Sequence, residues 1–491
     1  MRRARSTTSD TGSNVMRNEV KFSIVALDLF ERPVRLRLPF RFGAATLREA
    51  PQAFVRAQIR FADGRSASGW AAEMMMPKWF DKSLQRSNEQ NLDDLRRSLA
   101  LAAQAYGSEH TARTAFGHAA SHYRSLLAAG AGEGLNALVA SFGAALVDRA
   151  ILDAVCHAQK WSFATAIQNN VPGIDATLTP DLREFAFAAF LDALLPVSTI
   201  SVRHTVGLLD PLASSDVAAR PDDDLPVALD EVIARYGHRH FKLKLAGDGA
   251  QDFERLAQIA AVLDTLPQYA VTLDGNEQFD FVEAVHDLWR AADAEPRLAR
   301  LSSATLYLEQ PLSREIALSA DVHELARFKP LVIDESDATF DAFPLARRLG
   351  YAGVSSKSCK GIYKSLVNAA RCSNSINTGS AFITGEDLTA QAGLALQQDL
   401  ALVGLLGVTH VERNGHHYVD GFTGQDAPRD EHAAFQHGHP DLYETTVRGT
   451  RLVIRNGMIA LGSIGCSGFA SGAIPAIESL APMKTAAVPI T

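Results

Sequence analysis

The feature that most constrains this fold is a series of five short apolar runs, each of which ends in a charged residue. The runs lie between residues 240 and 357, and the charges that end them are Lys244, Asp274, Glu309, Asp334 and Lys357. The steps between these charges are about 30, 35, 25 and 23 residues, the length of one strand–loop–helix–loop unit. Buried parallel strands are apolar and rarely tolerate a charge. Five charges in register therefore predict an active site where the strands end.

The rhythm of strand and helix extends on both sides of these runs. Strand-like segments recur at 200–206, 240–245, 271–274, 306–309, 331–334, 352–357, 382–384 and 408–411. Helical patterns separate them, as in Phe253, Leu256, Ala260 and Leu263, which fall on one helix face. About eight alternating units over roughly 230 residues favour a closed, TIM-like (β/α)8 barrel over an open doubly wound sheet. No Gly-rich turn of the GxGxxG or GxxxxGK[ST] type is present, which argues against a nucleotide site.

Strand patterns frame the barrel at both ends of the chain. Residues 21 to 73 read as strands and residues 92 to 168 as helices, which together predict an α+β domain. Residues 452–461 read as a hairpin with its turn at Asn456-Gly457. We therefore predict a disordered tail over 1–20, an α+β domain over 21–175, the barrel over 176–440 and a C-terminal segment, 441–491, that returns to the α+β domain.

Composition excludes several classes of partner. The 491 residues carry 48 Lys+Arg against 56 Asp+Glu, a net charge of −8, so no basic field predicts binding to nucleic acid or to an anionic membrane. The four cysteines form no CxxC pair, which argues against a disulfide framework or a zinc site and is compatible with a reducing cytoplasm. No apolar run reaches the roughly 18 residues that span a bilayer. We expect a cytoplasmic protein that binds a small molecule, and a homo-oligomer is compatible with this sequence.

The charged residues at the strand ends suggest a particular chemistry. Active sites of such barrels lie at the C-terminal ends of the strands. Asp274, Glu309 and Asp334 end three successive strands, so their carboxylates are expected to converge. Three carboxylates without His or Cys suit a hard divalent cation, above all Mg²⁺, with water and substrate as the remaining ligands.

Lysines complete the predicted site. Lys242 and Lys244 are two residues apart and point to the same side of a strand, and Lys357 comes from a strand across the barrel. A dication and neighbouring ammonium groups lower the pKa of a lysine, which then acts as a general base near neutral pH. A carboxylate substrate bound to the cation would have an acidified α-proton, and a lysine on either face would remove or return it.

These motifs together resemble the mandelate racemase/muconate-lactonising branch of the enolase superfamily. The matching motifs are Lys242-Leu243-Lys244 for Lys-x-Lys, Asp274-Gly275-Asn276 for Asp-x-Asn, Glu309-Gln310-Pro311 for Glu-Gln-Pro, Asp334-Glu335-Ser336 for Asp-Glu-Ser, and Lys357 for the lysine of the sixth strand. The N-terminal strands, with Gly69-Trp70, and the helix around Leu152-Asp153 resemble the capping domain of that family.

The resemblance implies a capping domain on a modified (β/α)7β barrel, one Mg²⁺ or Mn²⁺ ion, and proton abstraction α to a carboxylate through a stabilised enediolate. Racemisation or epimerisation, cycloisomerisation and syn-elimination share this step. The lysine pair is similar to that of the muconate-lactonising subgroup. It implies that Lys244 and Lys357 are the acid/base pair, that Lys242 neutralises the substrate carboxylate, and that Asp274, Glu309 and Asp334 bind the metal.

Two segments depart from the family pattern. The sixth strand usually continues as Lys-x-x-Lys-x-Gly-Gly, whereas here Lys357 is followed by Ser358-Cys359-Lys360-Gly361-Ile362. Lys360 therefore competes with Lys357 for the catalytic role, although Lys357 fits the strand end better. The eighth strand, 410–414, lacks the Asp-x-Asp of dipeptide epimerases.

Other residues are candidates for supporting roles. Asn276 and Glu335 are candidates for contacts around the metal or the substrate. Glu386 either supports the site or caps a helix. Phe40-Arg41-Phe42 reads as a loop tip that closes over the site, with Arg41 as a partner for an anionic group.

For the remaining polar and aromatic clusters, ordinary structural interpretations are favoured. For Met74–Met76 and Trp79, core packing is favoured over contact with a substrate. For the pairs His410/Glu412 and His416/His417, solvation is favoured over metal ligation. Two other functions stay open: a Schiff-base aldolase or lyase that uses Lys357, and a catalytically silent barrel with a structural or binding role.

Overall fold

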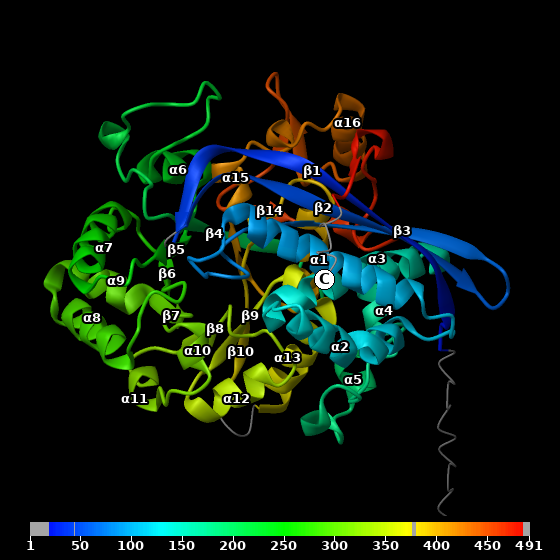
Figure 1. Cartoon of the computed structure of the whole chain (residues 1–491). Coiled ribbons are helices and arrows are strands. Elements are labelled where there is room, and N and C mark those ends of the chain that lie inside the picture. Colours follow the sequence, from blue (N-terminus) through cyan, green and yellow to red (C-terminus); the bar gives the residue numbers. More distant parts are fainter. Residues whose placement is uncertain (1–18, 44, 376–379, 485–491) are drawn as a thin grey trace, which may run out of the picture.

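The computed structural model describes residues 19–43, 45–375 and 380–484, so most of the predicted tail (1–20) lies outside the described residues. At its centre is a parallel sheet of eight strands that closes on itself (Figure 1). Its strands are β4 (Thr199–Val206), β5 (His240–Lys244), β6 (Ala270–Asp274), β7 (Thr305–Glu309), β8 (Leu331–Ile333), β9 (Gly353–Ser356), β10 (Phe382–Gly385) and β11 (His410–Arg413). Parallel pairing of β11 with β4, for example His410 with Ser201, completes the barrel. The predicted closed barrel is confirmed.

Helices follow the first seven of these strands. They are α6 (Leu229–Tyr236), α7 (Gly249–Leu263), α8 (Val282–Ala294), α9 (Ala299–Ala304), α10 (Arg314–Ala317), α11 (His323–Ala326), α12 (Ala342–Leu349), α13 (Ile362–Asn374) and α14 (Leu394–Leu405). After β11 come the four-residue α15 (Gly415–Tyr418) and then α16 (Arg429–Gly438). An ion pair of 2.7 Å between Arg32 and Glu431 joins α16 to the N-terminal sheet rather than to the barrel. The barrel is therefore of the (β/α)7β type.

Alternation along β5 explains why charged side chains enter the barrel. Phe241 and Leu243 belong to an apolar cluster that they share with residues of α7. Because successive side chains of a strand point to opposite faces, Lys242 and Lys244 face the interior. The same period of two turns Asp274 inward while Leu273 packs outside.

The cap consists of a four-stranded antiparallel sheet and three long helices. The strand order is β15 (Ala481–Pro482), β1 (Phe22–Phe42), β2 (Ala45–Phe61) and β3 (Ser66–Met74), and the helices are α1 (Asn88–Gly107), α2 (Ala115–Gly132) and α3 (Ala137–Gln159). The far end of the β1–β2 hairpin bends toward β4 and β5 (Figure 1). β1 continues through Phe42, so residues 40–42 are a strand and not the loop tip that we expected from the sequence.

A close approach of β3 to α3 holds the cap together. A Cβ atom on Gly69 would lie 2.1 Å from the backbone nitrogen of Ala154, so only glycine fits there. The buried Asp153 carboxylate accepts hydrogen bonds from the backbone N–H groups of Trp70 (2.7 Å) and Phe469 (2.6 Å). One side chain of α3 thus fastens both β3 and the C-terminal segment.

The C-terminal strands pair differently from the predicted hairpin. The tight turn is present, since Arg455 and Met458 exchange backbone hydrogen bonds. However, β13 (Thr450–Leu452) pairs with β12 (Tyr443–Thr445), and β14 (Met458–Ala460) pairs antiparallel with β4. The first residues of β4, Thr199 and Ile200, extend beyond the registers with β5 and β11. Their backbone groups would otherwise be an unpaired edge, and β14 satisfies them.

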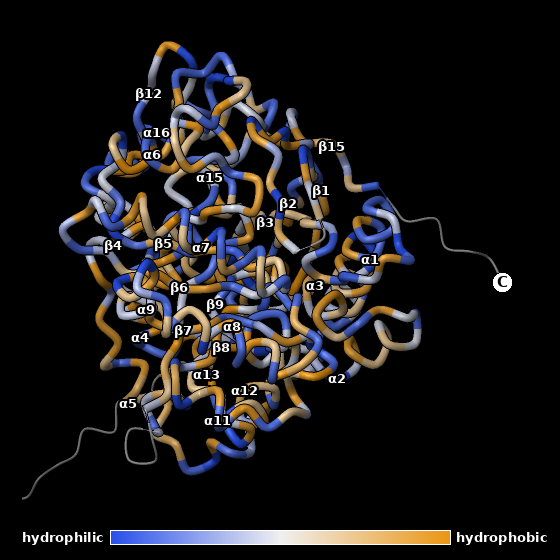
Figure 2. Tube along the Cα trace, turned by 90° about the vertical axis from the view of Figure 1, so that its left-hand side faces the viewer, coloured by the Kyte–Doolittle hydropathy of each residue, from blue (hydrophilic) through white to orange (hydrophobic). Residues whose placement is uncertain are grey.

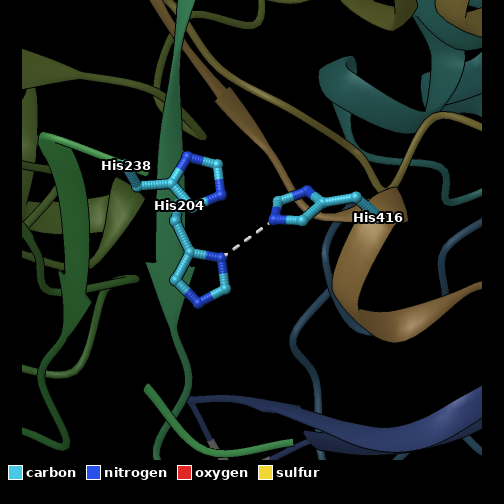
Figure 3. Close-up of side chains that lie close together, drawn as sticks. All are labelled: His204, His238 and His416. Atoms are coloured by element: carbon cyan, nitrogen blue, oxygen red, sulfur yellow. Dashed lines mark hydrogen bonds between the residues drawn. The ribbon is translucent and has the colours of Figure 1, made fainter. Parts of the chain in front are cut away.

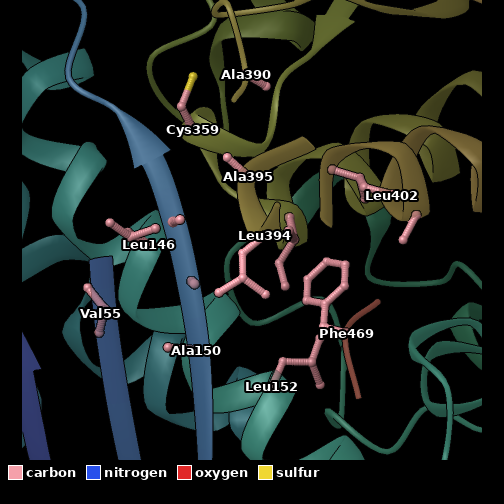
Figure 4. Packing of buried hydrophobic residues seen from close by; sticks show 14 of the residues in the cluster. Val55, Leu146, Ala150, Leu152, Cys359, Ala390, Leu394, Ala395, Leu402 and Phe469 are labelled. Atoms are coloured by element: carbon pink, nitrogen blue, oxygen red, sulfur yellow. The ribbon is translucent and has the colours of Figure 1, made fainter. Parts of the chain in front are cut away.

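Two apolar clusters form the core. One joins the cap to α13, α14 and the C-terminal segment, and Figure 4 shows its centre, where Val55 and Leu146 of the cap approach Leu394 and Phe469. The other lies between β5–β8 and the helices outside them. Hydrophobic and hydrophilic residues alternate at short intervals along the chain (Figure 2). Among the helices of the described residues, none combines the length and apolar character needed to cross a membrane.

Candidate active site

A row of charged side chains lies where β5, β6 and β7 end. Lys244 pairs in register with Asp274, and Asp274 pairs with Glu309. Asp334 follows β8 directly, so the next strand places a third carboxylate at the same mouth of the barrel. The Lys244 ammonium donates to Asp274 Oδ2 at 2.6 Å.

Lys242 lies one layer deeper and is surrounded by carboxylates. Its Nζ atom is 2.8 Å from oxygens of Glu309 and Glu386, and 2.9 Å from oxygens of Asp274 and Glu412. Burial alone would lower the pKa of Lys242, but these carboxylates outweigh burial and raise its pKa well above the usual value. The lowered lysine pKa expected from the sequence would therefore require a bound dication, because the carboxylates alone act in the opposite direction.

The opposite wall of the site carries the two competing lysines. Lys357 Nζ donates to Asp334 Oδ2 at 2.6 Å, and Lys360 Nζ lies 3.2 Å from Asp334 Oδ1. Lys357 lines a small cavity together with Lys244, whereas Lys360 lines a separate cavity with Tyr106 and other cap residues. Of these two lysines, Lys357 is the one among the described lining residues that shares a cavity with Lys244.

The carboxylate ring fits a hard cation. Burial, together with the negative charges of Asp274 and Glu386, raises the pKa of Glu309 well above its usual value. The ammonium groups of the lysines therefore do not fully neutralise the negative charge of the carboxylate ring. Three buried oxygen atoms, Asn276 Oδ1, Glu309 Oε2 and Glu335 Oε2, accept no hydrogen bond of good geometry from any described residue, although Lys242 Nζ lies 2.8 Å from Glu309 Oε2. An all-oxygen donor set with excess negative charge is what Mg²⁺ or Mn²⁺ prefers.

The residues that follow the metal-type carboxylates position them. The backbone N–H of Asn276 donates to Asp274 Oδ1 at 2.9 Å, and its side chain donates to Glu335 at 3.2 Å. Gln310 has a φ angle of +34°, a strained conformation for a residue with a side chain. Its side-chain oxygen accepts the Asp334 N–H at 2.8 Å, so the strain accompanies a contact that orients Asp334.

Aromatic and thioether side chains from the cap close the cavity. Phe40, Phe42, Met76 and Trp79 line it together with the lysines. The Lys357 ammonium lies 4.2 Å from the centre of the Trp79 ring, a cation–π contact. Met76 and Trp79 are buried, as core packing predicts, and they also face the site. Arg41 is exposed, because β1 turns alternate residues to opposite faces, and so it does not reach the cavity.

A lysine of the cap reaches into the barrel mouth. Lys82 Nζ lies 2.8 Å from Glu277 Oε2 and 2.9 Å from Glu335 Oε1. Arg314 of α10 binds Glu277 at 2.8 Å and donates to the backbone oxygen of Phe80 at 2.7 Å. These contacts fasten the segment 75–87, which contains Trp79, over the site. The sequence offered no signal for Lys82, which lies far from its partners along the chain.

Two residues of the first and eighth strands were not predicted to take part. Arg203 faces into the barrel, where it forms an ion pair with Glu386 and donates to the Tyr307 hydroxyl at 2.5 Å. Glu412 is buried against Lys242, so the solvation that we expected for it is wrong. The half-buried His410 contacts Arg203 at 3.0 Å. Glu386 supports the site through Lys242 and Arg203 and caps no helix. Arg203 and Glu412 occupy inward-facing positions of β4 and β11, and the alternation along these strands was the signal that would have identified both.

The chain shares its capped (β/α)7β barrel with solved structures. No protein-family model matches the chain, and no curated protein matches it. Solved structures do match. The muconate lactonizing enzyme from Pseudomonas fluorescens, complexed with muconolactone, has a TM-score of 0.57 at 16% identity over 93% of this chain and 98% of its own.

Two further structures have the same fold. The 2-chloromuconate cycloisomerase from Rhodococcus opacus 1CP has a TM-score of 0.56 at 16% identity, covering 93% of this chain and 98% of its own. An enolase from Bradyrhizobium, complexed with magnesium and mandelic acid, has a TM-score of 0.54 at 13% identity, covering 92% and 97%. The resemblance to the enolase superfamily is thus confirmed at the level of the fold.

Proposed function

We propose that this chain is a Mg²⁺-dependent enzyme that removes the proton α to the carboxylate of a small substrate. The observation that supports this most is that Lys244 and Lys357 line one small cavity beside a ring of carboxylates. Their strands, β5 and β9, are the second and sixth of eight and therefore face each other across the barrel. Two bases on opposite walls can reach one substrate carbon from both sides.

Three carboxylates would hold the cation. Asp274, Glu309 and Asp334 would be its protein ligands, and the ion, when bound, supplies positive charge that acidifies the α-proton of a carboxylate substrate. The Lys242 ammonium contacts two of these ligands, Asp274 and Glu309, and also contacts Glu386 and Glu412. We assign to Lys242 the neutralisation of charge that builds up near the substrate carboxylate. Lys242 is not among the described residues that line the cavity, so its positive charge would act from the layer of side chains beneath the cavity.

The two cavity lysines would exchange protons with the substrate. Each is held by one carboxylate at 2.6 Å, Lys244 by Asp274 and Lys357 by Asp334. Burial alone would lower the pKa of Lys357, but Asp334, helped by Glu309 and Glu412, outweighs burial and raises that pKa. When the carboxylate charge is shared with a cation, a lysine gives up its proton more easily. One neutral lysine would then take the α-proton, and the ammonium of the other would return a proton to the opposite face.

The cap would exclude water from this exchange. Phe40, Phe42, Met76 and Trp79 leave a cavity with apolar walls opposite the charged strand ends. A dry cavity strengthens the electrostatic contacts within it. The walls suit a small carboxylate that carries an apolar or aromatic group. Racemisation or epimerisation, cycloisomerisation and syn-elimination all begin with the same proton transfer, and we propose one of these reactions.

The test is deuterium exchange at the α-carbon in D₂O. The panel would contain N-acyl amino acids, dipeptides and aromatic α-hydroxy acids, each with Mg²⁺ and again with EDTA. We expect exchange into at least one class, its loss with EDTA, and a fall of about 10²–10⁴-fold in Lys244→Ala and in Lys357→Ala. The half-buried Lys329 precedes β8, at the opposite end of that strand from Asp334, and its ammonium lies 5.8 Å from the centre of the Trp289 ring. It provides the control Lys329→Ala, which should exchange like the unmodified chain.

Two outcomes would contradict the proposal. Exchange that survives both EDTA and the loss of both lysines would place the chemistry elsewhere. Exchange that is kept in Lys357→Ala but lost in Lys360→Met would transfer the role to Lys360.

The Schiff-base alternative has less support. A lysine that forms a Schiff base needs no metal ion, so this reaction would leave the carboxylates of Asp274, Glu309 and Asp334 without a role. Borohydride trapping with carbonyl substrates should therefore leave Lys357 unmodified.

A further inference from the structure

Three histidines meet on the outer wall of the barrel, away from the carboxylate ring. His204 lies on β4, His238 lies between α6 and β5, and His416 lies on α15 (Figure 3). One ring nitrogen from each lies within 4.8 Å of the others, and His204 Nδ1 is 3.1 Å from His416 Nε2. The neighbours of His204 on β4 face inward, since Arg203 contacts Tyr307 and Thr205 contacts Glu412, so His204 faces outward. We name these three residues the histidine cluster.

The cluster is buried and short of hydrogen bonds. His204, His238 and His416 are 2%, 0% and 7% exposed, so the solvation that we expected for His416 is wrong. Neither ring nitrogen of His238 makes a hydrogen bond of good geometry with a described residue, and neither does His416 Nδ1. The contact of the Val202 backbone with the His238 ring opposes the effect of burial on the His238 pKa, but it falls outside good hydrogen-bond geometry. Buried polar atoms without partners are rare and need an explanation.

The rings are in the form that binds metals. Burial lowers the pKa of each of the three well below its usual value, and the neighbouring histidines lower it further. A neutral imidazole offers one nitrogen lone pair, and a metal ion is bound by that form. The nearby Arg37 does not carry an uncompensated charge, because its guanidinium forms an ion pair of 2.5 Å with Asp223.

We propose that the histidine cluster is a second metal site, specific for a borderline-soft ion of the Zn²⁺ type. Imidazole ligands suit Zn²⁺, whereas Mg²⁺ requires oxygen ligands, so this site and the carboxylate ring select different ions. Zn–N bonds of about 2.0–2.1 Å in tetrahedral geometry place ligand nitrogens roughly 3.3 Å apart. The His204–His416 pair already has this spacing, and His238 needs a shift of about 1–2 Å at most.

Three protein ligands leave one position of a tetrahedral ion for water or a further donor. His416 also lines a narrow cleft with Tyr236, Asp420 and Arg451, which provides a path for the ion. The absence of CxxC pairs argued against a zinc site in the sequence, but a site made only of histidines from three distant segments leaves no such motif.

The position of the cluster indicates a structural role. A metal here would tie β4 and the start of β5 to α15. Tyr418 of α15 packs on Phe40 with ring centres 4.1 Å apart, and Arg37 donates to the backbone oxygen of His417 at 2.7 Å. Phe40 is part of the cavity wall, so the ion would steady that wall from outside without contacting a substrate.

Zinc titration of the full-length, chelator-stripped chain tests this proposal. In the presence of excess Mg²⁺ we expect one Zn²⁺ per chain and a rise in Tm, since an ion that binds only the folded state stabilises it. His238→Gln should weaken Zn²⁺ binding by at least about a hundredfold, because even outer contacts of metal ligands contribute 10–100-fold. The matched control is His118→Gln, which replaces a buried histidine of the cap. Asp274→Asn controls for binding to the carboxylate ring. Neither substitution should change the affinity for Zn²⁺.

Co²⁺ absorption of the unmodified chain provides a readout that does not depend on how the variants fold. We expect the intense visible bands of a four-coordinate site, retained in Asp274→Asn. Absence of stoichiometric Zn²⁺ binding by the unmodified chain, or unchanged binding in a folded His238→Gln, would overturn the proposal and leave three tightly packed neutral histidines.

Discussion

Lys82 offers a direct test of how the cap is held over the barrel mouth. Lys82→Met keeps the aliphatic stem but removes the ammonium that joins Glu277 and Glu335. Glu277 keeps Arg314 as a partner, whereas the fully buried Glu335 keeps, within the described part of the chain, only the Asn276 amide at 3.2 Å. Removal of one partner of a buried ion pair costs about 3–5 kcal/mol. The Lys82 side chain is 23% exposed, so screening by water reduces this to about 2 kcal/mol.

A loss of about 2 kcal/mol shifts the ratio of closed to open segment roughly 30-fold. Hydrogen–deuterium exchange of residues 75–87 should therefore accelerate by about that factor, while peptides from the barrel strands keep their rates. KM of the proposed reaction should rise more than kcat falls. The control is Lys78→Met, because the Lys78 ammonium donates to the backbone oxygen of Ser83 within the same segment and does not bridge to the barrel. Unchanged exchange in Lys82→Met, or equal acceleration in Lys78→Met, would refute this reasoning.

Three further substitutions test electrostatics, packing and positioning. Burial raises the pKa of Asp148 to about 7, whereas an unfolded chain has a value of about 3.9. The free energy of unfolding is therefore unaffected by Asp148 below pH 4, where the carboxyl is protonated in both states. It falls by up to about 4 kcal/mol as the pH rises to 7. Asp148→Asn should abolish this loss in chemical unfolding at pH 4 and pH 8, and equal pH dependence in both proteins would contradict it. Gly69→Ala should lower Tm sharply or prevent folding, because the new Cβ would meet the α3 backbone at 2.1 Å; a Tm within a few degrees of the original would show that α3 can move. Gln310→Ala should lower kcat by about 10–100-fold with a smaller effect on Tm, because Asp334 loses its orienting contact; an unchanged kcat would show that Asp334 needs no such support.

The arrangement of the barrel and most of the charged ring could be predicted from the sequence. Parallel strands are short apolar runs, and their ends share one edge, so a charge at each end is both visible and informative. Lys244, Asp274 and Glu309 were predictable for that reason, and the structure places them in one register. The choice of Lys357 over Lys360 also followed from the strand end.

Contacts between distant segments could not be predicted in this way. Lys82 meets Glu335 only after the cap has docked, and no local pattern encodes that distance. The turn at 455–458 was visible, but the partner of β14 is set by the unpaired edge of β4, a property of the closed barrel. His204, His238 and His416 each look ordinary in their own segments. Arg41 was misplaced because residues 40–42 were read as a loop, whereas a strand turns Arg41 away from Phe40 and Phe42.

The pairing of β15 with β1 has a consequence for the order of events during synthesis. Residues 22–42 leave the ribosome long before their neighbours at 481–482 and before the Asp153 contacts at 469 and 471. At about 5–20 residues per second, roughly 440 residues separate these events by about 20–90 s. During that time one edge of β1 has no partner, and edge strands invite association with other chains. The arginines at 32, 35 and 37 place positive charge along β1, which opposes such association while the edge is unpaired. In the completed fold the same arginines form ion pairs with Glu431, Asp426 and Asp223.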